Sequence, residues 1–157
     1  MKNSHSKVTF DLKQPIQFLA LGFGSGLAPK APGTFGTLAA IPFFLLLTML
    51  TPLFYLIVVA LMSIAGIYIC GKAAEDVGVH DHPAIVWDEF VGFFITMFMV
   101  PVSWTSVLVG FLLFRIFDIL KPWPISFIDK KISGGLGIMF DDILAGAFAL
   151  VIMQLIF

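Results

Sequence analysis

The chain has little charge for its length. Only 12% of its 157 residues are charged and 59% are hydrophobic, whereas a soluble domain has about 25% charged and about 45–50% apolar residues. This composition excludes a soluble globular enzyme and indicates an integral membrane protein. The sequence also lacks the alternating segments of about ten residues that a transmembrane barrel requires. We therefore expect an all-α membrane bundle.

Two further absences narrow the possible functions. Cys70 is the only cysteine, so an intramolecular disulfide and a paired-cysteine redox motif are excluded. Since Cys70 lies in an apolar run, we expect it to be a buried hydrophobic side chain. The formal net charge of −1 provides no broad cationic field, which excludes nucleic acid as a partner.

The few charges are confined to short parts of the sequence. Nine Lys and Arg and ten Asp and Glu fall at Lys2 to Lys13, at Lys30, at Lys72 to Glu89 and at Arg115 to Asp142. Uncharged gaps at 14–29, 31–71, 90–114 and 143–157 separate or follow these groups. A membrane crossing needs about 20 apolar residues, so the gaps predict the topology.

The longest gap predicts a hairpin over 34–70, because Thr51-Pro52 interrupts it near the middle. A second, shallower hairpin over 90–117 would turn at Pro101, although one tilted helix over 90–114 is the alternative. We expect a short interfacial helix near 15–23 and a C-terminal helix entered directly after Asp141-Asp142. The whole chain, 1–157, is expected to form one membrane-embedded domain.

The expected hairpins return the chain to the same face of the membrane. They would place Lys30, Asp88, Arg115 and Asp142 on one side. Lysines near the N-terminus, at positions 2, 7 and 13, favour a cytoplasmic location for that side.

Two adjacent pairs of carboxylates are the first candidate site residues. Asp88-Glu89 and Asp141-Asp142 each precede an apolar segment, where acidic residues often do no more than stabilise a helix N-terminus. One acidic residue per helix would suffice for that role. Two pairs supply four oxygen-donor side chains that can converge on a hard cation such as Mg²⁺.

The candidate cations lie close to these carboxylates in the sequence. Arg115, Asp118 and Lys121 are spaced three residues apart, so neighbouring members share a helix face that Pro122 should end. Either they form a helix-terminal salt bridge, or Asp118 binds a metal while the two cations bind an anionic substrate. Both interpretations can hold together.

Two other motifs carry weaker signals. Lys30 precedes Gly33-Thr34-Phe35-Gly36-Thr37, where a helix N-terminus and the hydroxyls of Thr34 and Thr37 would receive a phosphate, although such residues also cap ordinary helices. The histidines of His80-Asp81-His82 are more typical of a hydrogen-bonded surface pair than of a zinc site. The glycines of Ser133-Gly-Gly-Leu-Gly137 favour a plain loop.

Several phosphatase mechanisms need groups that this sequence lacks. It has no Cys-x5-Arg loop, no Asp-x-Asp motif and no histidine-nucleophile signature, since its histidines lie only at positions 5, 80 and 82. Direct attack by water with the help of a divalent metal ion remains possible.

The motifs taken together resemble the phosphatidylglycerophosphatase A family over nearly the whole chain. The similarity covers Gly22 to Pro29, Pro32-Gly-Thr-Phe-Gly-Thr-Leu38, Val79-His-Asp-His82, Ile85-Val-Trp-Asp-Glu-Phe-Val-Gly92, Phe114-Arg-Ile-Phe-Asp-Ile-Leu-Lys-Pro-Trp-Pro124 and Gly134 to Gly146. The resemblance implies a Mg²⁺-dependent, multi-pass enzyme of the bacterial inner membrane. Such an enzyme hydrolyses phosphatidylglycerophosphate to phosphatidylglycerol and inorganic phosphate in glycerophospholipid biosynthesis.

The resemblance places the main polar residues within the family's acidic and basic signatures, and their individual roles are our inference. The catalytic candidates are Asp81, Asp88, Glu89, Asp118, Asp141 and Asp142, of which all but Asp81 are also candidate metal ligands. The candidates for binding the phospholipid substrate are Lys30, Thr34, Thr37, Arg115 and Lys121. Membrane lipids would surround the apolar helices and hold the acyl chains of the substrate.

Two other function classes are possible for such a membrane protein, but each fits this sequence less well. A divalent-cation transporter would use the same carboxylates, but it predicts ionisable groups near the middle of the membrane spans, and the long gaps contain none. A non-enzymatic membrane scaffold leaves the two acidic pairs, Arg115 and Lys121 unexplained.

Overall fold

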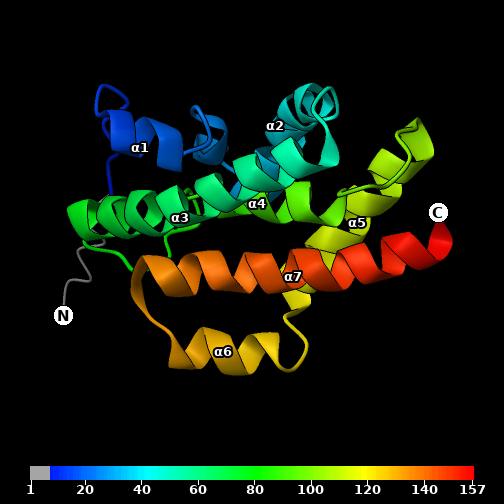
Figure 1. Cartoon of the computed structure of the whole chain (residues 1–157). Coiled ribbons are helices and arrows are strands. Elements are labelled where there is room, and N and C mark those ends of the chain that lie inside the picture. Colours follow the sequence, from blue (N-terminus) through cyan, green and yellow to red (C-terminus); the bar gives the residue numbers. More distant parts are fainter. Residues whose placement is uncertain (1–7) are drawn as a thin grey trace.

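The computed structural model describes residues 8–157, which are helical and contain no strand (Figure 1). Lys2 and Lys7, two of the lysines that favour a cytoplasmic location for the charged side, lie outside this part of the chain. The elements are α1 (Pro15–Ala20), the 3₁₀ turn η1 (Ser25–Leu27), α2 (Pro32–Leu47), α3 (Pro52–Val77), α4 (Trp87–Thr96), α5 (Trp104–Leu120), α6 (Ile125–Lys131) and α7 (Gly134–Ile156). The expected all-α fold is confirmed.

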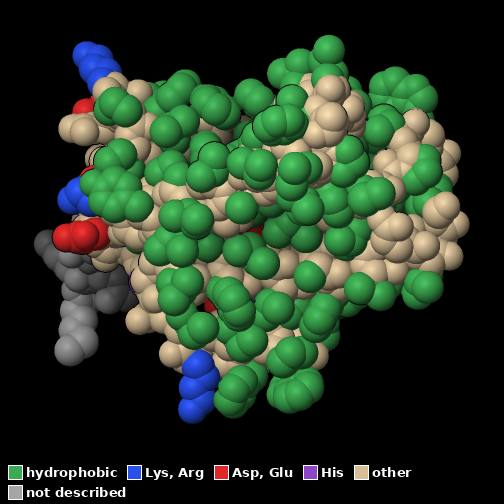
Figure 2. All heavy atoms as spheres, in the orientation of Figure 1, with side chains coloured by type: hydrophobic (Ala, Val, Ile, Leu, Met, Phe, Trp, Pro, Cys, Tyr) green, Lys and Arg blue, Asp and Glu red, His purple; other side chains and the backbone are tan. Residues whose placement is uncertain are grey.

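Two of these helices are long and apolar enough to cross a membrane. They are α3, with 26 residues, and α7, with 23, which at about 1.5 Å per residue reach at least the roughly 30 Å of a bilayer core. Hydrophobic side chains cover most of the face in Figure 2, while the visible charges lie toward the end where α7 begins. The fold is therefore a membrane helical bundle with one charged end.

Both expected hairpin connections form, although α2 packs against α4 rather than along α3. In the first, α2 and α3 are joined by a turn in which the Thr51 hydroxyl accepts a hydrogen bond from the Phe54 N–H at 3.5 Å. In the second, α4 and α5 are joined by residues 97–103, and Ser103 and Ser106 form reciprocal capping hydrogen bonds that begin α5. With only 10 residues, α4 is about 15 Å long and too short to cross the membrane.

The start of the last helix differs from the prediction. Instead of following Asp142, α7 begins at Gly134, so Asp141 and Asp142 lie about 10–12 Å along the helix and do not cap it. The expected plain loop is the first turn of this helix. Its glycines permit close packing, because a Cβ atom on Gly135 would collide with the Ile67 carbonyl oxygen of α3.

The packing of α4 against α7 depends on two further glycines, Gly92 and Gly146. A Cβ atom on Gly146 would collide with the Gly92 carbonyl oxygen, and one on Gly92 would lie 2.9 Å from the Asp142 carbonyl oxygen. Small residues of this kind let two membrane helices approach closely. This contact holds the first turn of α4 beside Asp142 of α7.

We predict that Gly146→Val lowers the free energy of unfolding by about 1–3 kcal/mol, as overpacking of a filled core does, because the new side chain forces α7 away from α4. Thermal unfolding in detergent micelles measures the change. Ala147→Val is the matched control, since Ala147 is the next residue of α7 and is only partly buried. Equal unfolding temperatures for Gly146→Val and the wild type would contradict this account of the helix contact.

Candidate active site

A group of buried carboxylates lies where α4 meets α7. Asp88 and Glu89 occupy the first turn of α4, and Asp142 belongs to α7; the three residues are 5%, 8% and 3% exposed. One carboxylate oxygen from each lies within 4.8 Å of the others. The fold thus brings together both members of the first predicted pair and one member of the second, from positions more than fifty residues apart in the sequence.

Hydrogen bonds do not account for this group. Asp88 Oδ1, Glu89 Oε2 and Asp142 Oδ2 are buried without a hydrogen-bond partner among residues 8–157. Helix N-terminal stabilisation explains the presence of Asp88 and Glu89, but it does not explain Asp142, which lies inside α7. An unpartnered buried carboxylate is costly, so this donor set fits an oxygen-bound cation.

The electrostatics of α4 point the same way. Burial raises the pKa of Asp88 well above its ordinary value, and the nearby Asp142 and Glu89 charges raise it further. Burial also raises the pKa of Glu89 to about 7, although the Arg115 guanidinium opposes this shift. Both pKa shifts arise because negative charges lie close together in a site with little solvent. A bound cation would stabilise the ionised carboxylates.

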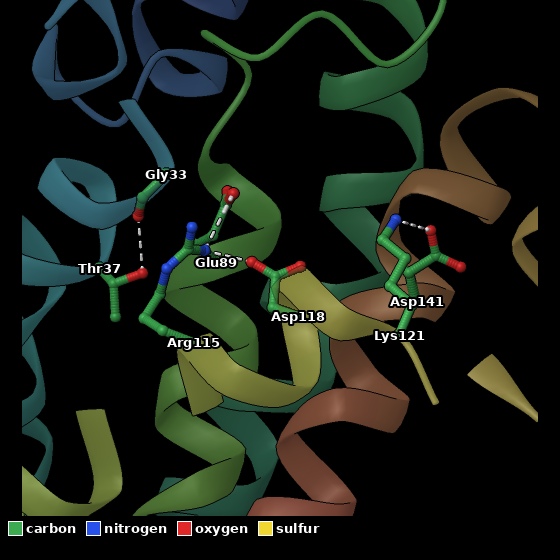
Figure 3. Close-up of polar contacts among 7 residues, drawn as sticks. All are labelled: Gly33, Thr37, Glu89, Arg115, Asp118, Lys121 and Asp141. Atoms are coloured by element: carbon green, nitrogen blue, oxygen red, sulfur yellow. Dashed lines mark hydrogen bonds and ion pairs between the residues drawn. The ribbon is translucent and has the colours of Figure 1, made fainter. Parts of the chain in front are cut away.

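Arg115 lies beside Glu89 (Figure 3). Its Nη1 donates a hydrogen bond to Asp118 Oδ2, one turn further along α5, and lies 3.8 Å from Glu89 Oε1. The Arg115 Nε is buried and has no partner among the described residues. The expected salt bridge therefore forms, and it leaves Nε without an acceptor among residues 8–157.

The N-terminus of α2 lies directly against this arginine. A Cβ atom on Gly33 would lie 2.8 Å from Glu89 Oε1 and 2.9 Å from Arg115 Nη2, so a side chain at this position would displace the ends of these two side chains. The Thr37 hydroxyl already donates to the Gly33 carbonyl oxygen at 2.8 Å (Figure 3). Thr34 donates its backbone N–H to the Ala31 carbonyl oxygen. Lys30 is exposed just before the helix.

A second polar group surrounds Lys121, the residue that ends α5. Lys121 Nζ lies 3.1 Å from Asp141 Oδ2 and 3.5 Å from Asp129 Oδ1. Burial lowers the pKa of Lys121, but the Asp141 charge and hydrogen bond outweigh it and leave the pKa raised. Asp81, in the loop before α4, lies beside Asp129 and Asp141. Asp141 and Asp142 are thus neighbours in sequence that belong to different groups.

Some residues of these groups carry no clear signal in the sequence. Asp129 lies on the short helix α6 within a mixed run of charges, and no spacing rule distinguished it from a solvated residue. Gly33 was recognised only as part of a helix start. The histidines lie in neither carboxylate group of the described chain, and His82 Nδ1 accepts a hydrogen bond from the Ala84 N–H at 3.0 Å.

Comparison with known proteins identifies the family. The family model described as Phosphatidylglycerophosphatase A matches residues 18–157. The chain is 49% identical over 152 residues to the Phosphatidylglycerophosphatase A of Escherichia coli (strain K12), covering 96% of this chain and 88% of the relative. It is 51% identical over 144 residues to the protein of the same name from Haemophilus influenzae, covering 90% and 88%. No solved structure matches the chain. The chain therefore belongs to the phosphatidylglycerophosphatase A family and is a phosphatase.

Proposed function

We propose that this protein hydrolyses phosphatidylglycerophosphate to phosphatidylglycerol and inorganic phosphate. A water molecule forms the new bond to phosphorus, the bond between phosphorus and the terminal glycerol oxygen breaks, and that oxygen receives a proton. The observation that carries the proposal is the buried group of Asp88, Glu89 and Asp142 beside Arg115, in a chain of this family.

We further propose that Mg²⁺ is held by Asp88, Glu89 and Asp142, with Asp118 close by through its contact with Arg115. The fit rests on the unpartnered oxygens of the three buried carboxylates, since oxygen ligands suit a hard divalent cation. When bound, Mg²⁺ would neutralise phosphoryl oxygens and position the reacting groups.

Arg115 is proposed to bind the phosphate that is removed. Asp118 accepts a hydrogen bond from Nη1 and fixes the plane of the guanidinium group, while Nε has no acceptor in the part of the chain that the structure describes. A planar guanidinium group can donate parallel hydrogen bonds to phosphate oxygens. Lys121 adds positive charge nearby, and Asp129 and Asp141 hold its ammonium group.

The bundle suits a lipid substrate. Charged side chains gather toward one end of the molecule, and apolar side chains cover most of the remaining visible face (Figure 2). The phosphorylated glycerol would reach the site while both acyl chains remain in the bilayer. A transporter remains the alternative, but its ion site is expected near the middle of the spans, whereas Asp141 and Asp142 lie in the first half of α7.

We predict that phosphate release from phosphatidylglycerophosphate stops in excess EDTA and returns with Mg²⁺. Asp142→Asn should lower turnover by orders of magnitude and raise the Mg²⁺ concentration needed, because it removes one negative charge from the proposed ligand set. Asp76→Asn is the matched control, since Asp76 pairs with Lys72 on the surface of α3. Turnover that persists in EDTA, or a folded Asp142→Asn variant with the wild-type Mg²⁺ response, would contradict the metal assignment.

We predict a different pattern for Arg115. Arg115→Gln should lower the rate of phosphate release by about 10²–10³, as the loss of one electrostatic donor does, without changing the Mg²⁺ dependence. Arg115→Lys should lose less, because it keeps the charge and loses only the planar fork. Lys72→Gln is the surface control. A shifted Mg²⁺ requirement in Arg115→Gln would mean that Arg115 acts through the metal site.

The enzyme is proposed to lie in the bacterial inner membrane as a multi-pass protein, with the site facing the cytoplasm. In a Cys70→Ala background, cysteines at Lys30 and Lys130 should react with a membrane-impermeant maleimide only after permeabilisation. Cysteines at Met49 and Met99, which lie in the turns between helices and are 82% and 67% exposed, should react in intact spheroplasts. Reaction of all four positions from one side would disprove this topology.

A further inference from the structure

Asp81, Asp129 and Asp141 form a second group of three carboxylates, apart from the proposed Mg²⁺ ligands. They come from the loop before α4, from α6 and from α7, and one oxygen of each lies within 4.8 Å of the others. Asp141 directly precedes Asp142 in α7, so the two side chains project in different directions and reach different groups. The second group shares no residue with the first.

Lys121 only partly neutralises this second group. Its Nζ lies 3.1 Å from Asp141 Oδ2 and 3.5 Å from Asp129 Oδ1. The group contains three carboxylates and one paired ammonium group, so two negative charges remain when all the carboxylates are ionised. A divalent cation would balance that remaining charge.

The buried oxygen of Asp141 points more directly to a ligand. Asp141 is 3% exposed, and its Oδ1 has no hydrogen-bond partner among the described residues. The pairing with Lys121 uses the other oxygen, Oδ2, and Figure 3 shows the remaining oxygen pointing away from the ammonium group. Within the described chain, an ion-pair network alone thus leaves a buried carboxylate oxygen unsatisfied, which is costly for a charged group.

We propose that Asp81, Asp129 and Asp141 form a second divalent-cation site, with Oδ1 of Asp141 as its buried ligand. The donors are all oxygens, which selects a hard cation such as Mg²⁺ or Mn²⁺ over zinc. Asp81 is exposed and Asp129 is half-buried, so water can complete the coordination. This open side makes the second site weaker and faster to exchange than the buried site of Asp88, Glu89 and Asp142.

The experiment is a Mn²⁺ titration of the purified full-length chain in detergent without substrate, with free Mn²⁺ followed by electron paramagnetic resonance. The wild type should bind two Mn²⁺ per chain with different affinities. Asp129→Asn should weaken the lower-affinity site at least about tenfold and leave the tighter site unchanged, because it removes one charged oxygen ligand. Asp81→Asn should have the same effect, and its exposed position makes a folding defect an inadequate explanation.

Two controls separate this inference from the proposed function. Asp76→Asn removes a surface carboxylate of α3 that pairs with Lys72, and it should leave both affinities unchanged. Asp142→Asn should remove the tighter site while the weaker one persists. A wild type that binds one Mn²⁺ or none overturns the second site, as does unchanged binding in both Asp129→Asn and Asp81→Asn. Loss of Mn²⁺ binding in Asp76→Asn would also overturn it, by showing that surface charge alone binds the ion.

Discussion

The close approach of α4 and α7 is the constraint on which the rest of the site depends. Gly92 and Gly146 let the two helix backbones meet without intervening side chains. Asp88 lies one helical turn before Gly92, and Asp142 lies one turn before Gly146, so the same contact brings their carboxylates together. Phe114 of α5 packs against Gly92, which helps to fix the helix that carries Arg115.

Burying this much negative charge in an apolar bundle requires compensation. Arg115 offsets Glu89 and Asp118, and Lys121 offsets Asp129 and Asp141. These two cations lie on or directly after α5, and buried oxygens of Asp88, Asp141 and Asp142 still lack partners within the described chain. A bundle selected only for stability would replace such groups with hydrophobic residues, so their retention is consistent with a role in binding ions and phosphate.

The different lengths of the helices place this chemistry at one end of the bundle. The long helices α3 and α7 have the lengths of membrane spans, whereas α4 has 10 residues and begins among the polar groups. A short helix can start inside the bundle and present its first turn to α7 and α5. The charged residues remain near one end as a result, while the large apolar side chains elsewhere are exposed, as expected of helices in contact with lipid (Figure 2).

The amino-acid sequence by itself determined the membrane class, the turns before α3 and α5, the burial of Cys70 and the family. These properties follow from composition, from the spacing of charges and from turn residues such as Thr51-Pro52, which act locally. Only the tertiary structure decided which carboxylates meet. The sequence predicts that Asp141-Asp142 is one pair directly before a helix, but α7 begins at Gly134. The glycines of this segment favour a loop locally, but they pack against α3 and the helix continues through them. Adjacent helical residues project about 100° apart, so Asp142 joins Asp88 and Glu89 while Asp141 joins Asp81, Asp129 and Lys121.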